Sequence, residues 1–161
     1  MIPSTSPSAP LRAGYPRQSR GFLNNNPGNI DRSEPPWLGE IRDITLCQND
    51  TQRVELGQGR FCVFVDARHG IRAMARNLAA YYGRLGLKTV RGLVYRWAPP
   101  HENNTQGYLQ RVCSATGLGP DDEITDLAAA LPALIDAIIR VECAGMPYGG
   151  TEIADGIAMA N

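Results

Sequence analysis

The sequence predicts a mainly α-helical domain with one small β-hairpin, and three observations lead to this class. Apolar residues recur at helical spacing through most of the chain after residue 70. Cap-forming residues precede these stretches, and glycine or proline follows them. A short β-rich segment lies before the helices, between residues 53 and 65. No internal repeat is visible, so the 161 residues are expected to hold one domain.

The chain divides into a predicted flexible arm, residues 1–20, and a predicted domain, residues 21–161. The arm is rich in proline and serine and has almost no large aliphatic side chain, so it cannot bury enough apolar surface to fold alone. It carries three arginines and no acidic residue, which suits either contact with an acidic partner or a solvated tail. The domain begins with an irregular, asparagine-rich stretch up to Trp37, because prolines interrupt any regular ladder there.

A β-hairpin is expected after this stretch. Residues 53–56 and 60–65 are rich in β-forming side chains, and Gly57-Gln58-Gly59 joins them. The apolar spacing then changes to the helical period, which predicts five helices. Their expected positions are Gly70 to Gly86, Thr89 to before Pro99, Thr105 to before Gly117, Asp122 to Cys143, and Thr151 to Ala160. Pro132 either kinks the fourth helix or starts its second half.

Composition and charge exclude several classes of function. Sixteen basic and sixteen acidic residues give no net charge, which argues against a surface that binds nucleic acid. No stretch approaches the roughly 20 consecutive apolar residues that cross a bilayer, so no membrane span is expected. The N-terminus lacks the apolar centre of a secretory signal, so something else must deliver the chain if it acts outside the cytoplasm.

Cysteine and histidine positions predict no metal site and no cofactor. The cysteines contain no close pair, and neither histidine has an acidic or cysteine partner at ligand spacing. The cysteines are expected to be small buried residues with reduced thiols. A bridge between Cys47 and Cys62 is the alternative, if the two face each other across paired strands. The other residues of these two types are Cys113, Cys143, His69 and His101.

The stretch from Gly21 to Ile30 contains four asparagines and is the first cluster that suggests a binding surface. Asparagine amides donate and accept hydrogen bonds together, so they suit a surface that binds the hydroxyl and N-acetyl groups of a sugar. An ordinary Asx-rich turn explains the same residues equally well. The candidate substrate-binding amides are Asn25, Asn26 and Asn29, joined by Asn103 from a later loop.

Four aromatic side chains are candidates for stacking on sugar rings, namely Trp37, Trp97, Tyr108 and Tyr148. Stacking of this kind uses the flat apolar face of the ring, while a hydroxyl or indole N–H adds a polar contact. Core packing is the default explanation for aromatic residues at helical spacing. Together with the amides, these residues supply what a glycan-binding cleft requires.

Glu142 is the first candidate for a catalytic acid. Cleavage of a glycosidic bond needs a carboxyl group with a raised pKa that protonates the leaving oxygen. Glu142 ends an apolar helix, where the helix dipole disfavours its charge, and no lysine lies within six residues of it. Arg140 is two residues away and points to a different side of the helix. A solvated glutamate, or one paired with an arginine, is the alternative.

Glu102 is the second candidate acid. It follows Pro99-Pro100 in a stiffened loop, where helix capping and loop stiffening explain the residues without any chemistry. Glu40 and Glu55 lie in the β-rich region, where a second glycosidase carboxylate would stand across the cleft. For either of these two, a solvent-facing strand or turn residue is the simpler explanation.

Three blocks of the chain contain these clusters. They are Gly21-Phe-Leu-Asn-Asn-Asn-Pro-Gly-Asn-Ile30 with Trp37-Leu-Gly39, then Phe61 to Phe64 leading into Gly70-Ile-Arg-Ala-Met-Ala75, then Arg96-Trp-Ala-Pro-Pro-His-Glu-Asn-Asn-Thr105 with Tyr108. In this order they resemble virion-associated structural proteins of tailed and related bacteriophages, which are often described as lysozyme-like or lytic-transglycosylase-like. The resemblance covers about residues 20–160 and leaves the arm uncovered.

The resemblance implies a small, mostly helical lysozyme-like domain that locally opens peptidoglycan during genome delivery. It implies synthesis in the host cytoplasm, a place in the virion and action at the periplasmic cell wall. The implied partners are peptidoglycan glycan strands and, through residues 1–20, other virion proteins. The implied reaction cleaves the bond between N-acetylmuramic acid and N-acetylglucosamine, by a muramidase or a lytic transglycosylase. A non-catalytic virion protein that uses the same scaffold for docking is the alternative.

The order of the motifs differs from the lysozyme-like pattern. In such folds the catalytic glutamate ends a helix and the Gly/Asn-rich region follows it, whereas here that region comes first. We therefore expect a circularly permuted order, in which Glu142 returns to face Asn25, Asn26 and Asn29. Chain termini that lie close together make such a permutation sterically easy.

Overall fold

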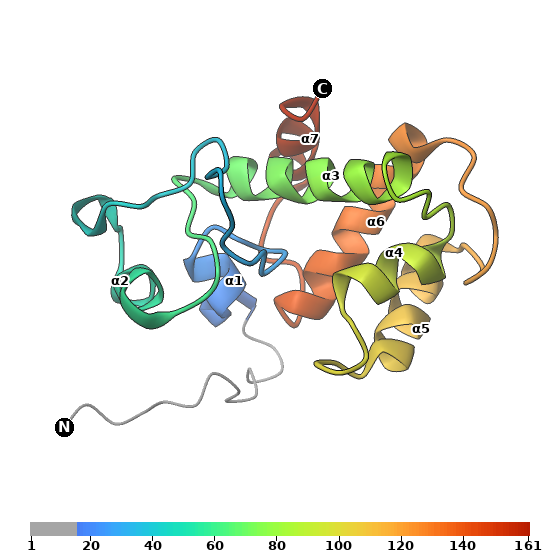
Figure 1. Cartoon of the computed structure of the whole chain (residues 1–161), viewed down its shortest axis with the longest axis horizontal. Helices are drawn as coiled ribbons and strands as arrows, with labels where there is room; N and C mark the ends of the chain where they lie inside the picture. Colours follow the sequence, from blue (N-terminus) through green and yellow to red (C-terminus); the bar gives the residue numbers. More distant parts are fainter. Residues whose placement is uncertain (1–15) are drawn as a thin grey trace.

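The computed structural model describes residues 16–161, and these residues fold mainly into α-helices (Figure 1). The helices are α1 (Arg20–Leu23), α2 (Asp50–Gln58), α3 (Ala67–Gly83), α4 (Val90–Trp97), α5 (Thr105–Thr116), α6 (Leu127–Glu142) and α7 (Gly150–Ala158). Two short 3-10 turns, Pro16–Gln18 and Ile44–Leu46, precede α1 and α2. The predicted mainly α-helical class is therefore confirmed.

The long helices α3 and α6 form the middle of the fold, with α4 and α5 on one side and α1 and α2 on the other (Figure 1). α7 packs on α3 and α6, and α5 packs on α4 and α6. Their apolar faces make the main core. A second, smaller core contains Ile41, Cys47 and Val63, with Leu56 of α2 against it. The part of the chain before α3 therefore forms a side lobe.

Side-chain caps explain where the central helices begin. Asp66 accepts a hydrogen bond from the amide of His69 at the start of α3, and Thr89 accepts one from Gly92 at the start of α4. Thr89 was the predicted cap of α4, and this prediction is confirmed. α3 begins before the predicted Gly70 because Asp66 is the cap.

The last three helices differ from the prediction at their starts. Asn104, not Thr105, caps α5, and Asp126 caps α6. Pro132 lies inside a continuous α6, in its second turn. α7 begins at Gly150, one residue before the predicted cap Thr151. A change of one to five residues at a helix start is common where several cap-forming residues follow one another.

The predicted β-hairpin at residues 53–65 is wrong. Residues 50–58 form α2, because Asn49 caps this helix through the amide of Gln52 and Asp50 occupies its first turn. The helix also buries Gln52 and Glu55 on one side. Residues 60–65 are extended, yet among the described residues they make only two isolated antiparallel bridges, Asp31 with Phe61 and Glu40 with Phe64.

Residues 1–15 of the predicted arm lie outside the described residues. Of its last five residues, Pro16–Gln18 form a 3-10 turn, and the buried Ser19 caps α1 by accepting a hydrogen bond from Phe22. All four cysteines are free, so Cys47 and Cys62 do not form a bridge. Cys113 is partly exposed and the other three cysteines are buried, in agreement with the predicted reduced thiols.

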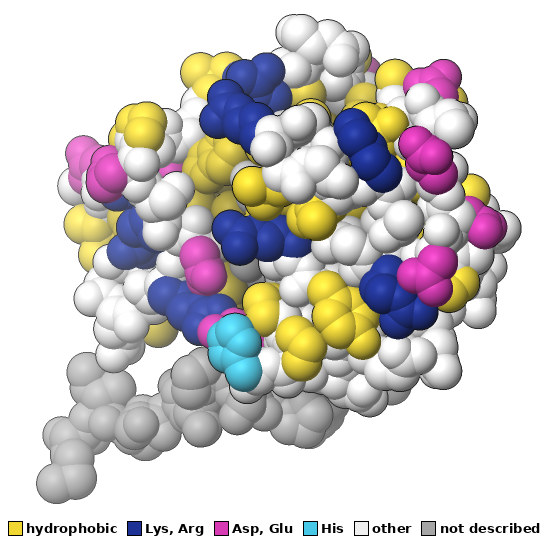
Figure 2. Space-filling view, turned by 45° about the vertical axis from the view of Figure 1, so that its right-hand side comes forward, with side chains coloured by type: hydrophobic (Ala, Val, Ile, Leu, Met, Phe, Trp, Pro, Cys, Tyr) yellow, Lys and Arg dark blue, Asp and Glu magenta, His cyan; other side chains and the backbone are white. Residues whose placement is uncertain are grey.

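Basic and acidic side chains alternate over the surface and do not gather by sign (Figure 2). Most of the ion pairs among residues 16–161 are formed between exposed groups, such as Arg91 with Asp121 and Arg140 with Asp136. This distribution agrees with the zero formal charge of the chain. It offers no continuous basic surface on the face shown.

Candidate active site

Glu142 is the last residue of α6, and its carboxylate is held by two side chains from distant parts of the chain. The Nδ2 group of Asn29 donates a hydrogen bond of 2.8 Å to Oε2. The hydroxyl of Tyr108, in the first turn of α5, donates one of 2.9 Å to Oε1. The structure thus brings the predicted acid to one of the three predicted asparagines, as the expected fold-back requires.

The position of Glu142 is fixed by the packing of α6. Leu134, Ile135, Ile138 and Ile139 are almost completely buried and anchor the helix in the main core. Cys143 follows Glu142 and is also completely buried, with its Sγ 3.8 Å from the carbonyl oxygen of Pro27. The apolar half of α6 therefore leaves the carboxylate at its end little freedom to move.

Asn29 reaches Glu142 because the loop from Asn25 to Asn29 is tightly folded. Asn25 and Asn29 both have positive φ angles, 54° and 47°, a backbone region that asparagine tolerates better than most residues. A Cβ atom on Gly28 would lie 2.7 Å from the ring of Trp97 and 2.8 Å from Met74. Only glycine fits between these two side chains, so the loop lies directly on α3 and α4.

Burial raises the pKa of the Glu142 carboxyl above its ordinary value. The hydrogen bonds from Asn29 and Tyr108 and the positive charge of Arg20 lower it, but they do not compensate for the burial. Glu142 is only partly buried as a whole residue, while its carboxyl group lies almost entirely inside the protein. A carboxyl group of this kind can carry a proton nearer to neutral pH than a solvated glutamate does.

The neighbours of Glu142 remain protonated donors over the physiological range. Burial and the nearby Glu142 carboxylate raise the pKa of Tyr108 well above its ordinary value, so its hydroxyl keeps its proton. Burial raises the pKa of the Cys143 thiol to about 11, so this group stays neutral. The titrating group of the cluster is therefore Glu142 itself.

The other asparagines of the run stabilise the fold and do not face Glu142. Asn25 donates to the carbonyl oxygen of Phe64 at 3.0 Å. Asn26 is completely buried and donates to the carbonyl oxygens of Ile30 and Cys62, both at 3.0 Å. These amides tie the loop to the extended segment after α2, as in an ordinary Asx-rich turn. Of the three predicted sugar-binding amides, only that of Asn29 lies beside the carboxylate.

Glu102 lies on the surface, in the loop between α4 and α5. Arg60 makes a salt bridge of 3.1 Å with it, and His101 approaches at 3.5 Å. The hydrogen bond and charge of Arg60 lower the pKa of Glu102. A carboxylate that is ionised and exposed is a poor proton donor at neutral pH. The geometry therefore favours Glu142 over Glu102 as the acid.

Replacement of Glu102 by glutamine is expected to leave any glycan cleavage by the protein within about twofold, because an exposed ion pair contributes little. Urea unfolding should show a nearly unchanged midpoint, and its small change should vanish in high salt. Turbidity loss of a cell-wall suspension measures the activity. A drop of more than about tenfold in a folded variant would instead place Glu102 in the reaction.

The other two candidate carboxylates, Glu40 and Glu55, are also held by neighbouring groups. Glu55 is buried in α2, where it accepts hydrogen bonds from the amide of Phe61 at 2.8 Å and from Asn24 at 3.4 Å. Glu40 pairs with Arg42 and accepts a bond from the amide of Trp37. Both groups therefore hold loops of the side lobe, and their hydrogen-bond partners do not include Glu142.

The predicted sugar-stacking aromatics are partly buried. Trp97 meets Tyr81 edge to face at 6.3 Å, and Tyr148 packs on Phe22 at 5.6 Å. Trp37 packs against the main core, and Asn103 is exposed with a bond to the carbonyl oxygen of Pro99. Tyr108 and Trp97 are the two predicted aromatics with a link to the site, because the Tyr108 hydroxyl donates to Glu142 and the indole of Trp97 lowers the pKa of Glu142. Stacking on a sugar remains a prediction for all of them.

Arg20 was not predicted as part of the site. It starts α1, its guanidinium lies 4.1 Å from the ring centre of Phe61, and its charge acts on Glu142. The sequence placed it at the end of a solvated arm. Its position directly before Gly21 and the asparagine run was the available signal for a place near the carboxylate.

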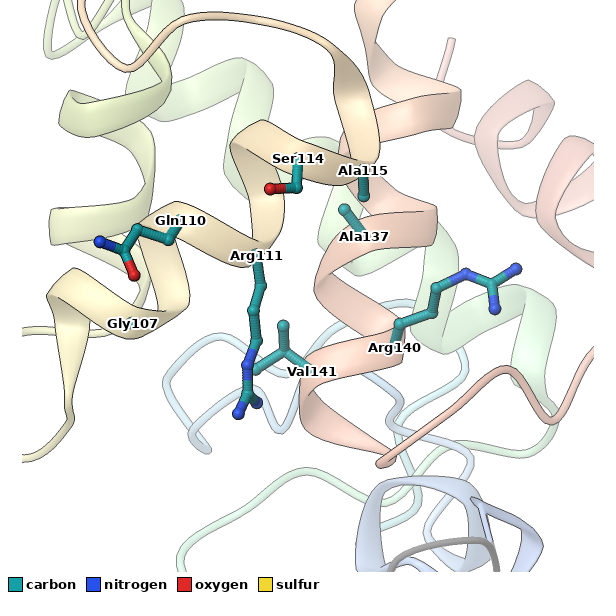
Figure 3. A pocket seen from close by; sticks show the side chains of 8 residues that line it. All are labelled: Gly107, Gln110, Arg111, Ser114, Ala115, Ala137, Arg140 and Val141. Carbon is teal, nitrogen blue, oxygen red and sulfur yellow. The ribbon is translucent and has the colours of Figure 1, made fainter.

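An open depression of about 660 Å³ lies between α5 and α6 (Figure 3). Gly107 and Val141 line it, and they are the residues before Tyr108 and Glu142. Arg111 and Arg140 extend on either side of Val141. Glu142, Asn29 and Tyr108 are not among the residues that line it.

Two further observations concern the described part of the chain. Among residues 16–161, no group of three histidine, cysteine or acidic side chains is arranged to hold a metal ion. Within the same residues, no helix is long and apolar enough to cross a membrane.

Comparison with known proteins gives one informative relationship. No model of a known protein family matches the chain. The chain is 35% identical over 141 residues to Protein P5 of Pseudoalteromonas phage PM2. The matched region covers 86% of this chain and 79% of Protein P5. Identity at this level over most of both chains shows common descent, so the chain belongs to the family of this bacteriophage protein.

Proposed function

We propose that the protein is a virion-associated bacteriophage enzyme that cleaves the glycan strands of peptidoglycan, with Glu142 as both acid and base. The relationship to a phage protein supports the origin of the chain. The arrangement of Glu142 carries the enzymatic part of the proposal, because its buried carboxyl has a raised pKa and is held by Asn29 and Tyr108.

The chemistry follows from the two states of this carboxyl group. In the protonated state, Glu142 gives its proton to the glycosidic oxygen as the bond to N-acetylmuramic acid breaks. In the ionised state, it takes a proton from the group that attacks the sugar. This group is water in a muramidase and the sugar's own hydroxyl in a lytic transglycosylase.

A transglycosylase agrees better with the surroundings of Glu142. A muramidase commonly uses a second carboxylate that holds water or stabilises the charge on the sugar. The carboxylates of Asp31, Glu40, Glu55 and Glu102 are engaged elsewhere, in ion pairs or buried hydrogen bonds. An internal hydroxyl nucleophile needs only one acid and base, which Glu142 supplies.

The relationship to a phage protein supports a place in the virion, and action at the cell wall is part of the proposal. A phage component made in the host cytoplasm needs no signal of its own if the virion carries it to the periplasmic cell wall. Residues 1–20 are proposed to contact other virion proteins, since their composition does not support a core of their own.

Incubation of the purified protein with purified cell walls tests the enzymatic proposal. We expect a loss of turbidity and soluble muropeptides that end in anhydro-muramic acid, identified by mass spectrometry. Products that end in a reducing muramic acid would assign hydrolysis. No soluble product from a folded protein, over several substrates and pH values, would refute the enzymatic function.

A non-catalytic virion protein is the second candidate. Leu38, Ile44, Leu46 and Val54 of the side lobe each expose more than half of their surface. Apolar side chains in such positions favour contact with another protein over free solvation. Absence of wall cleavage, together with stable incorporation into particles, would support this function.

A further inference from the structure

The amide of Asn29 has one paired and one unpaired polar atom. Its Nδ2 group donates to Oε2 of Glu142 at 2.8 Å. Its Oδ1 atom is buried and has no hydrogen-bond partner among the described residues. A buried acceptor without a partner is unfavourable, so it calls for an explanation.

The observed hydrogen bonds suit the ionised carboxylate. Both oxygens of Glu142 accept a bond, from Asn29 and from the hydroxyl of Tyr108. A proton on Oε2 would face the N–H of Asn29, and two donors that face each other repel. A proton on Oε1 would face the proton of the Tyr108 hydroxyl, which has no other acceptor among the described residues.

We propose that Asn29 is a positioning residue whose carboxamide turns over each time Glu142 gains or loses a proton. With ionised Glu142, Nδ2 donates to Oε2. With protonated Glu142, the reversed amide presents Oδ1, which accepts the bond from Oε2–H. This inference deepens the proposed function, since an acid that later acts as a base must be held in both states.

The reversal does not increase the number of buried polar atoms that lack a hydrogen-bond partner. In the ionised state Oδ1 is the buried atom without a partner. In the protonated state Nδ2 takes its place, while the bond to Glu142 is kept. Asparagine is one of two side chains with a donor and an acceptor on the same carbon, and the shorter of them. Neither an ionised aspartate, which only accepts, nor leucine at position 29 can exchange the two roles.

Other groups near Glu142 do not provide this exchange. Arg20 from α1 adds a fixed positive charge, and the indole of Trp97 from α4 is a donor only. Tyr108 from α5 and the Cys143 thiol both keep their protons, because burial raises the pKa of each. The Tyr108 hydroxyl can also accept a bond, but its own proton then has no acceptor among the described residues. Asn29 is the neighbour whose side chain carries a separate donor and acceptor that can change places.

Nuclear magnetic resonance of the wild-type protein, without substrate, tests the inference. The side-chain carboxyl carbon of Glu142 and the side-chain amide nitrogen and protons of Asn29 are followed between pH 4 and 9. We expect the Asn29 amide signals to change with the same midpoint as the Glu142 carbon. An Asn29 amide that does not change while Glu142 titrates would overturn the proposal.

Three variants sharpen this test. Asn29→Gly keeps the positive φ and removes the amide, so the midpoint of Glu142 should rise, because the donor that favours the charged form is lost. Asn29→Asp should raise it further, because two carboxylates then share the site. Asn25→Gly is the matched control, since Asn25 also has a positive φ but bonds to Phe64. In this variant, the titration midpoint of Glu142 should equal that of the wild type.

The activity of the same variants gives the second readout. If the proposed function holds, Asn29→Gly should lose about tenfold or more in wall cleavage, and its optimum should move towards higher pH. The Asn25→Gly control should keep the wild-type optimum. A wild-type protein that cleaves no wall but shows the coupled titration would refute the function and leave the amide reversal in place. An active enzyme without coupled titration would support the function and refute the amide reversal.

Discussion

Replacement of Glu142 by glutamine is expected to lower wall cleavage by at least about a hundredfold and also to stabilise the folded protein at neutral pH. The loss of activity follows because glutamine has no proton to give and none to take. The gain in stability follows from burial, which raises the pKa of Glu142 and so makes its ionised form unfavourable in the folded state.

The sign of the pH dependence follows from the same shift. Between the ordinary value of 4.5 and the raised pKa, the folded state binds more protons than the unfolded state. The stability that Glu142 contributes is therefore complete below pH 4.5 and is lost as the pH rises through the raised value. Glutamine stays neutral, so the advantage of the variant should be greatest near pH 8 and disappear in acid.

Urea unfolding of both proteins at a series of pH values measures this effect. The midpoint of Glu142→Gln should lie above that of the wild type at pH 8, with equal slopes. Equal midpoints near pH 4 serve as the internal control. A variant that is less stable than the wild type at pH 8 would show that the hydrogen bonds to the carboxylate outweigh its burial.

Replacement of Gly70 by alanine is expected to destabilise the protein by about 1–3 kcal/mol, although alanine usually favours a helix. A Cβ at this position of α3 would collide with the backbone oxygen of Asn25 and lie 3.0 Å from Pro27. Backbone atoms cannot move aside as a flexible side chain does, so the loop must shift. Because this loop carries Asn29, wall cleavage should fall together with stability.

Gly57 of α2 is the matched control for Gly70. No atom lies within 4 Å of a Cβ built on Gly57, and this residue is exposed. Gly57→Ala should therefore stabilise the protein by about 0.5–1 kcal/mol. Thermal or urea unfolding of the two variants should give shifts of opposite sign. Shifts of the same sign would show that the loop does not lie on α3 as described.

The helical half of the fold could be predicted from the sequence because its local and long-range preferences agree. Leu134, Ile135 and Ile138 recur at helical spacing and are buried in α6. Helix α2 was missed because residues 53–56 are too short to distinguish the two periods. The better signal was the cap Asn49, followed by Gln52 three residues later, which resembles a capping box.

The site was predictable in part. Glu142 could be singled out because it follows an apolar helix, and the structure places it against Asn29. The separate tasks of Asn25 and Asn26 could not be predicted, since chemically identical amides differ only by the direction that the backbone gives them. The pairing of Glu102 with Arg60 joins residues 42 positions apart, and no local pattern indicates it.

Asn29 and Glu142 are separated by 113 positions along the chain, and this has a consequence for biosynthesis. A ribosome completes the asparagine loop early and the carboxylate only shortly before it reaches the last helix. Products of premature termination before residue 142 therefore contain Asn29 but lack Glu142. If the proposed function holds, such fragments cannot cleave peptidoglycan.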